Sequence, residues 1–244
     1  MEKDSLLFGR NPVLEALRSG RPVDKVLIQQ GAEGSIGKII AQAKQAGVPV
    51  LDAEKKTLDR MAGGTSHQGV AAYVSSYSYS TLEDIYQRAE ERGEPVLMVL
   101  CDDLEDPHNL GAILRSAECA GAHGVIIPKR NSVGLTQTVA KASAGAIEYM
   151  PVVRVGNLAQ TIERLKKDGV WIAACDMNGS RYTETDLTGK LAIVIGNEGK
   201  GISRLVREKC DYVVSIPMTG RIHSLNASNA AAVVLYEIRR QRDA

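Results

Sequence analysis

The stretch Leu191–Ser203, LAIVIGNEGKGIS, decides the fold class of this chain. Its five apolar residues predict a strand that is buried on both faces, a glycine-rich turn follows, and a helix begins near Ile202. From Pro95 onward the same order recurs, in which an apolar strand leads through a loop into a helix. This alternation is typical of a parallel sheet covered by helices on both faces, so we predict an α/β fold.

The alternating elements place three loops at the ends of strands. Ligands of open parallel sheets bind beyond the carboxyl ends of strands, and three predicted loops (102–109, 196–201 and 217–225) each follow an apolar strand and precede a helix. The strands are predicted at 96–101, 124–127, 170–175, 191–195 and 212–216, and the helices at 110–120, 158–167, 202–209 and 226–240.

The first of these segments is Asp106–Arg115, DPHNLGAILR. Its apolar residues recur at helical spacing and should face the core, whereas Gly111, Ala112 and Arg115 share another face. Two small residues would leave space there beside a long cation. Taken alone, a helix capped by Asn109 with a solvated arginine is the commoner explanation.

The other two segments are also ordinary when each is considered alone. Ile195–Gly201 lets the backbone approach a ligand closely, but it matches neither the dinucleotide pattern nor the P-loop pattern, so it could be a tight turn with a solvated Glu198. In Ile216–Ala231, a loop punctuated by proline and glycine runs through Ser224–Asn226 into an alanine-rich helix. That helix could pack at a subunit interface or be buried within the chain.

The first 75 residues predict a smaller α/β unit. A helix should begin at Asn11-Pro12, with Asn11 as its N-cap, and end near Gly20. Strands at 25–29, 48–51 and 69–74 and helices at 35–46 and 54–61 follow. The polar run Ser75–Ser80 indicates a boundary. We therefore predict domains at 1–75 and 95–244, joined by a linker and bridging helix at 76–94.

Composition leaves the partner open. Hydrophobic residues make up 44% of the 244 residues, enough for a substantial core, and the net charge is only +1. Cations that contact a nucleic acid would have to be concentrated locally, although each cluster alone is more typical of a solvated face. The candidate clusters are Arg10, Arg18, Arg21 and Lys25; Lys129 and Arg130; and Arg239, Arg240 and Arg242.

The four cysteines argue against a metal or disulfide framework. They are far apart, and neither CxxC nor a Cys/His ligand spacing occurs, so we expect no metal site. The sequence shows no basic-then-apolar leader, and no apolar run approaches the length of a membrane span. We therefore expect a cytoplasmic protein.

Taken together, the three segments resemble the SpoU (TrmH-type) branch of the SPOUT RNA methyltransferases. The resemblance rests on DPHNLGAILRSAECAG, IVIGNEGKGIS and SIPM…G…SLNASNAAAVVLYE, which occur in the family's order from about Pro95 to the end. The N-terminal LLFGRNPVLEAL and DKVLI resemble the small RNA-substrate-binding domain found before many of these enzymes. This second similarity favours the branch that methylates guanosine ribose in large-subunit (23S) ribosomal RNA.

The resemblance implies a fold, a cofactor and site residues. Members carry a C-terminal trefoil knot in which S-adenosylmethionine binds, a feature that periodicity could not predict because knots are rare. By the same resemblance, the adenine and sulfonium regions should be cradled by Ile195, Gly196, Ile216, Met218 and Leu225. The residues implied for catalysis are Asn109, Arg115, Glu198, Ser224 and Asn226.

The implied roles need one physical restriction. The family likeness places Arg115 beside the attacking 2′-hydroxyl, where it has been regarded as the base, but a charged guanidinium has no acceptor. We therefore expect Arg115 to contact ribose or phosphate and to stabilise the developing alkoxide. Glu198 should pair with and orient Arg115, while Asn109, Ser224 and Asn226 supply hydrogen bonds. Arg221, Ile222, His223 and Asn229 depart from the usual pattern.

One further expectation follows from the resemblance, and three alternatives stay open. Members form homodimers through the knot and closing helix, and the alanine-rich 226–237 stretch fits a tightly packed two-fold interface. The alternatives are a transfer-RNA ribose methyltransferase, a catalytically inactive RNA-binding homologue, and a nucleotide-dependent metabolic enzyme. The last is disfavoured because GxGxxG is missing.

Overall fold

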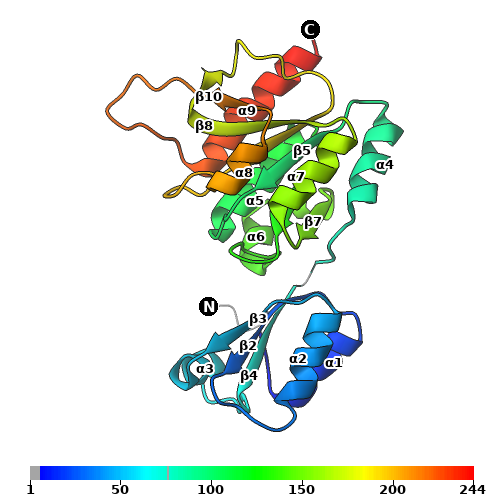
Figure 1. The fold of residues 1–244 in the computed structure, drawn as a ribbon, viewed down its shortest axis with the longest axis vertical. Helices are drawn as coiled ribbons and strands as arrows, with labels where there is room; N and C mark the ends of the chain where they lie inside the picture. Colours follow the sequence, from blue (N-terminus) through cyan, green and yellow to red (C-terminus); the bar gives the residue numbers. More distant parts are fainter. Residues whose placement is uncertain (1–5, 76) are drawn as a thin grey trace. The chain divides into compact units, whose positions relative to one another are not determined.

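The computed structural model describes residues 6–75 and 77–244 in two compact units (Figure 1). One unit comprises the chain up to Ser78 together with Gly134–Gln137, and the other comprises Tyr79–Val133 and Thr138–Ala244. Residues 1–5 and Ser76, which the predicted domain limits include, lie outside the described residues. The limits 1–75, 76–94 and 95–244 stay predictions.

The first unit is a four-stranded sheet with helices, in the strand order β1-β4-β2-β3. Strand β4 is antiparallel to β1 and β2, and β3 is parallel to β2, so β1, β2 and β3 share one direction. A core of aliphatic side chains, among them Val13, Val26 and Ile39, joins α1 and α2 to this sheet. The elements are β1 (Leu6–Phe8), α1 (Arg10–Arg18), β2 (Val23–Gln29), α2 (Ile36–Gln45), β3 (Val50–Ala53), α3 (Lys55–Ala62) and β4 (Val70–Val74).

The start of α1 differs from the prediction. The helix begins at Arg10 after Gly9, which adopts a φ of 95°, so the assignment of Asn11 as the N-cap was wrong. The Gln68 side chain explains the shift, because its Oε1 accepts a hydrogen bond from the Arg10 backbone N–H at 3.1 Å. The acceptor at the start of α1 therefore comes from a residue 58 positions away. The local sequence pattern could not indicate such a distant partner.

The second unit is a six-stranded sheet in the order β10-β8-β9-β5-β6-β7. All five strand pairs are parallel, which confirms the predicted parallel sheet. The elements are α4 (Leu82–Arg92), β5 (Leu97–Cys101), α5 (Pro107–Cys119), β6 (Gly124–Pro128), α6 (Gln137–Ala142), the 3₁₀ helix η2 (Ala146–Glu148), β7 (Val152–Val155), α7 (Leu158–Lys167), β8 (Trp171–Arg181), β9 (Leu191–Ile195), α8 (Arg204–Lys209), β10 (Tyr212–Ser215) and α9 (Ala227–Arg242).

Alternate strand residues build a core on each face of this sheet. Met98 and Leu100 of β5 join one cluster with residues of α4, α7 and α8. Because successive strand side chains point to opposite faces, Leu97 and Val99 face the other side, where α5 and α9 pack against each other (Figure 1). The central strands β5 and β9 are buried throughout. The predicted covering of both faces is therefore present.

Several details of the second unit differ from the prediction. Helix α5 begins at Pro107 and its N-cap is Asp106, whose Oδ1 accepts from the His108 N–H at 2.8 Å, so Asn109 is not the cap. Strand β8 continues to Arg181, and β7, α6 and η2 were not predicted. The trefoil knot stays a prediction. No helix in residues 6–75 and 77–244 combines the length and the hydropathy needed to cross a bilayer.

The basic cluster at the C-terminus has a structural role. The half-buried Arg242 donates to backbone carbonyls of Pro95 and Gly189, each at 2.7 Å, and so ties the end of α9 to the segments before β5 and β9. Arg240 pairs with Glu237, and Arg239 pairs with Asp243. Arg239 and Arg240 stay largely exposed in these pairs, as expected of a solvated face, whereas Arg242 is held by backbone carbonyls.

His123 lies just before β6 with a fully buried side chain. Its Nδ1 accepts a hydrogen bond from the Leu97 N–H at 2.9 Å, so the neutral ring carries its proton on Nε2. Burial lowers the His123 pKa to about 4, and the charge of Arg92 acts in the same direction, while Glu94, 3.5 Å from Nε2, partly opposes them. The folded protein therefore resists protonation of this histidine.

This burial predicts a specific acid sensitivity. An unfolded histidine gains a proton near pH 6.5, whereas folded His123 gains one only near pH 4, so its contribution to stability is lost as the pH falls between these values. The shift corresponds to on the order of 3 kcal/mol of unfolding free energy. Urea unfolding at pH 7, 6, 5 and 4 should show that His123→Asn lacks this loss. Parallel pH profiles for parent and variant would contradict the prediction.

Candidate functional site

Loops from three strand ends meet at the carboxyl edge of the second sheet. The loops after β5, β9 and β10 are the ones that the sequence predicted, and β5 lies directly beside β9. Strand β8 lies between β9 and β10, so its end also reaches this edge. The order of the strands therefore brings together four chain segments, of which the sequence predicted three.

The amide of Asn226 connects these segments. Its Nδ2 donates to Asn109 Oδ1 at 2.9 Å and also to Glu198 Oε1, while Asn109 Nδ2 donates to the same Oε1 at 2.7 Å. Asn226 Oδ1 accepts from the Ser228 N–H at 2.9 Å and so caps α9. Three of the five predicted catalytic residues thus form one hydrogen-bonded cluster, which we call the Asn226 cluster: Asn109, Glu198 and Asn226.

The glycine-rich turn is fixed by Asn197. Its Oδ1 accepts from the backbone N–H groups of Gly199 and Lys200 at 2.9 and 3.2 Å, and its Nδ2 donates to the carbonyl of Asp103 at 3.1 Å. The buried Asp102 accepts from the Ser203 N–H at 2.7 Å, which links the two loops a second time. The turn that presents Glu198 is therefore held in place by hydrogen bonds within the chain.

Glycine is required at position 196 because the backbone of residues 201 and 202 passes very close to it. A Cβ at this position would lie 2.4 Å from the Gly201 carbonyl carbon and 2.5 Å from the Ile202 nitrogen. These are backbone atoms, which cannot rotate away. The turn closes through hydrogen bonds between Asn197 and Gly201 in both directions, at 3.0 and 2.8 Å, so the close approach belongs to the turn itself.

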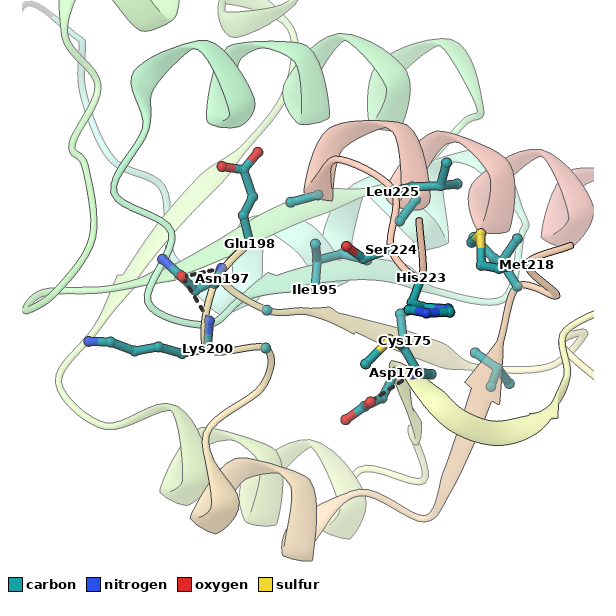
Figure 2. Close-up of a pocket in the computed structure, with 18 residues that line it drawn as sticks. Cys175, Asp176, Ile195, Asn197, Glu198, Lys200, Met218, His223, Ser224 and Leu225 are labelled. Atoms are coloured by element: carbon teal, nitrogen blue, oxygen red, sulfur yellow. Dashed lines mark hydrogen bonds between the residues drawn. The ribbon is translucent and has the colours of Figure 1, made fainter. Parts of the chain in front are cut away.

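A cavity of about 400 Å³ opens between these loops (Figure 2). All five predicted cofactor-binding residues line it, and so do Glu198 and Ser224 of the predicted catalytic set. Figure 2 shows Ile195 near its centre, between the glycine-rich turn and the side chains of Ser224, His223 and Met218. The cofactor-binding residues are Ile195, Gly196, Ile216, Met218 and Leu225.

The sequence prediction missed the part of the cavity that β8 supplies. Cys175, Asp176 and Met177 line it, and so does His223 from the loop after β10. Burial raises the pKa of the Cys175 thiol to about 12, so it is a neutral wall group and not a nucleophilic thiolate. The sequence did indicate that Cys175 ends an apolar strand. It did not indicate that this strand lies beside β9.

Arg115 is solvent-exposed, as its place on the helix favoured, but it does not form the pair with Glu198 that the resemblance implies. It is exposed on α5 and does not line the cavity, and no ion pair joins it to Glu198 in the part of the chain that the structure describes. The Glu198 carboxylate is instead held by the two asparagine amides. Gly111 does not make room for Arg115 either, because a Cβ there would meet Ala142 Cβ at 2.4 Å, so this glycine serves the packing against α6.

Comparison with known proteins relates both units to RNA modification. Residues 96–236 match the model of the SpoU rRNA methylase family, and residues 6–80 match a model described as RNA 2′-O ribose methyltransferase substrate binding. A Bacillus subtilis (strain 168) protein assigned to the TrmH family of tRNA/rRNA methyltransferases is 46% identical over 244 residues, which cover 99% of this chain and 98% of that protein.

Two solved structures have similar folds. An AdoMet-bound rRNA methyltransferase from Sinorhizobium meliloti has a TM-score of 0.60 and 26% identity, with 96% of this chain and 86% of that chain covered. The TrmH/SpoU tRNA modifying enzyme of A. aeolicus has a TM-score of 0.56 and 29% identity, with 66% of this chain and 84% of that chain covered. The likeness to the first structure extends over both units.

Gly196 and Gly199 provide a matched pair for testing the turn. A Cβ at Gly199 would meet only Asn197 Oδ1, at an ordinary 3.6 Å. We expect Gly196→Ala to lower the free energy of unfolding by about 1–3 kcal/mol and to reduce affinity for S-adenosylmethionine at least about tenfold. Gly199→Ala should change both far less. Thermal unfolding and calorimetry measure the two effects, and equal behaviour of the variants would show that the close approach at Gly196 is unimportant.

Proposed function

Because this chain belongs to the SpoU rRNA methylase family, we propose that it transfers a methyl group from S-adenosylmethionine to a ribose 2′-hydroxyl of RNA, at a guanosine of large-subunit ribosomal RNA. One observation carries the proposal: the cavity joins the five predicted cofactor-binding residues to Glu198 of the Asn226 cluster. These side chains come from loops that are far apart in the sequence. Their convergence is expected of a binding site and not of loops that only connect strands to helices.

The cavity suits the proposed cofactor in size and lining. Its volume of about 400 Å³ lies in the range of small-molecule sites, which combine apolar walls with a few polar groups. Ile195, Ile216 and Leu225 would contact the flat adenine, and Met218 would lie toward the sulfonium region. The backbone of the turn at Gly196, which lines the cavity, would read the edge of the purine. When bound, S-adenosylmethionine supplies an electrophilic methyl group.

Arg115 is proposed as a positioning and charge-stabilising group. It is exposed on α5, so an incoming ribose or phosphate can reach its guanidinium. A permanently charged guanidinium donates hydrogen bonds and offers no acceptor, which suits it to hold the substrate and to stabilise the developing alkoxide. With RNA bound, Glu198 would pair with Arg115 and orient it; the pairing itself is what the resemblance implies.

The Asn226 cluster is proposed to present an acceptor for the hydroxyl proton. Both amides donate to Oε1 of Glu198, and Oε2 has no hydrogen-bond partner among residues 6–75 and 77–244. Glu198 is the only carboxylate among the five proposed catalytic residues, and a fixed carboxylate with one open oxygen can accept a proton or a proton-bearing water. Ser224, which lines the same cavity, would donate to the ribose or to the cofactor.

Ribosomal RNA is favoured over transfer RNA by the extent of the likeness. The A. aeolicus tRNA modifying enzyme aligns with 66% of this chain, whereas the S. meliloti rRNA methyltransferase aligns with 96%. The first unit, which matches the substrate-binding model, is thus part of what an rRNA enzyme shares with this chain. The alternatives are transfer of the methyl group to tRNA and an inactive RNA-binding role.

Transfer of labelled methyl groups tests the function directly. The protein is incubated with methyl-labelled S-adenosylmethionine and either unmodified large-subunit rRNA or unmodified tRNA. We expect label in the rRNA only, in a dinucleotide that resists alkaline hydrolysis because its 2′-oxygen is methylated. Label in tRNA alone would show that tRNA, and not rRNA, is the substrate. Label that alkali releases as a single nucleotide would place the methyl group on a base.

Arg115→Ala tests the proposed site in the same assay. We expect methyl transfer to fall by about 10²–10³-fold, because a donor to developing charge is lost, while affinity for S-adenosylmethionine is kept. Arg164→Ala is the matched control, since Arg164 is an exposed arginine on α7 that pairs with Glu83. Near-normal turnover in Arg115→Ala would show that Arg115 is not part of the catalytic site.

A homodimer is part of the proposal, with α9 at its interface. The alanine-rich start of α9 is largely accounted for within the chain, because Ala227, Ala231 and Val234 are buried and α9 packs against α5. The outer face of α9 carries Tyr236, which is 55% exposed. A second copy of the chain would cover it.

Analytical ultracentrifugation checks the dimer. We expect twice the mass of one chain at micromolar concentration, and we expect Tyr236→Arg to shift the protein toward the monomer because a buried unpaired charge opposes association. Tyr149→Arg, at a tyrosine that is 70% exposed outside α9, should leave the dimer intact. A monomeric parent protein would contradict this part of the proposal.

A further inference from the structure

In the first unit, several strand ends gather at one edge of the sheet. Strands β1, β2 and β3 run in the same direction, so their carboxyl ends lie at one edge of the four-stranded sheet. The loop from Gly63 to Gly69, between α3 and β4, lies at this edge, because the Gly69 carbonyl accepts from the N–H of Gln29, the last residue of β2. Loops beyond the carboxyl ends of parallel strands bind ligands in α/β sheets, and β2 and β3 are such a pair here.

Arg10 holds this loop in one shape. Its Nε donates to the Gln68 carbonyl at 3.0 Å, and its Nη1 donates to Ser35 Oγ at 3.2 Å, just before α2. The Gln68 side chain returns a bond to the Arg10 backbone. Gln68 adopts a φ of +50°, which is unusual for a residue with a side chain, and these bonds hold it there.

His67 fixes the same loop through hydrogen bonds of both its ring nitrogens. It is buried, its Nδ1 accepts from the Gly69 N–H at 3.0 Å, and its Nε2 donates to Asp59 Oδ1 at 2.9 Å. The Asp59 side chain is 54% exposed and lines the cavity described below, so a ligand can reach its carboxylate. The loop therefore presents both acceptors and donors in fixed positions, which lowers the entropy cost of binding.

A cavity of about 510 Å³ lies along this loop. Its volume is in the range of sites for molecules of nucleotide size. Its walls offer cationic, anionic, amide and hydroxyl groups, and no Phe, Tyr or Trp is among them. The lining is formed by Gln29, Lys55, Asp59 and the loop residues Gly64–Gly69.

We propose that this cavity, which we call the loop cavity, receives an unpaired nucleotide of the substrate RNA and reads the edge of its base. The proposal rests on the proposed function, because it assumes that the ligand of the first unit is RNA, as the substrate-binding model over residues 6–80 suggests. It adds the place of recognition, which lies in the first unit and outside the catalytic cavity.

The mixture of groups favours a base over a bare phosphate. A phosphate site would concentrate donors and exclude carboxylates, whereas this cavity places the Asp59 carboxylate near Lys55. Base edges carry donors and acceptors side by side, and RNA is read in sequence mainly through unpaired bases. Without a large aromatic ring in the lining, recognition would depend on hydrogen bonds, so it should discriminate between sequences more than stacking does.

Direct RNA binding by the full chain tests the proposal. The probes are unmodified transcripts of large-subunit rRNA fragments, titrated in a filter-binding assay. The variants are Lys55→Glu and Gln29→Ala, and the matched control is Lys44→Glu, at an exposed lysine in the last turn of α2. We expect at least about tenfold weaker binding for Lys55→Glu and about threefold for Gln29→Ala, with less than twofold change for the control. Unfolding temperature and affinity for S-adenosylmethionine should be unchanged in all three.

The outcomes are distinguishable. Binding by Lys55→Glu and Gln29→Ala within twofold of the parent would overturn the loop cavity, and so would an equal loss in Lys44→Glu, which would reveal only a general charge effect. If the parent binds RNA and the two variants do not, but no RNA accepts a methyl group, the proposed reaction fails and the loop cavity stands. A parent protein that binds no RNA in this assay would overturn the loop cavity.

Discussion

The site depends on the side-chain amide of Asn226. An amide carries an acceptor and two donor hydrogens, and here all of these functions are used at once. The oxygen caps α9 through Ser228, and the nitrogen reaches Asn109 and Glu198. An aspartate could cap the helix equally well but would place a second carboxylate beside Glu198. Asparagine suits this position because one side chain caps a helix and also donates to residues of two distant loops.

The order of the strands makes that junction possible. Strands β5 and β9 are neighbours with matched register from Leu97–Leu191 to Cys101–Ile195, so the loops that follow them start at the same height. Asp102 and Asn197 then tie these loops together through the backbone of Ser203 and Asp103. The loops that carry the residues proposed for catalysis, Asn109 and Glu198, are therefore supported by a rigid sheet edge.

Local pattern was sufficient wherever a residue's role is decided by its neighbours in the chain. The helix Leu158–Lys167 and the strand Leu191–Ile195 were predicted with their observed bounds, because their apolar spacing agrees with their burial. Asn11 failed as a cap because Gln68 supplies the acceptor from elsewhere, and Gly111 was misinterpreted because its reason is Ala142 on another helix. Cys175 and Asp176 were missed for the same cause, since their place in the site comes from the position of β8 beside β9.

The use of the arginines bears on how RNA affinity can arise. The chain has a net charge of only +1, and Arg239, Arg240 and Arg242 are engaged in ion pairs or backbone carbonyls, while Arg10 holds a loop. Because these four arginines have partners within the chain, they would contribute less to counterion release, which makes binding strong and steeply dependent on salt. Shaped cavities and hydrogen bonds in both units would add to the affinity. Such contacts carry sequence information, whereas phosphate contacts alone do not.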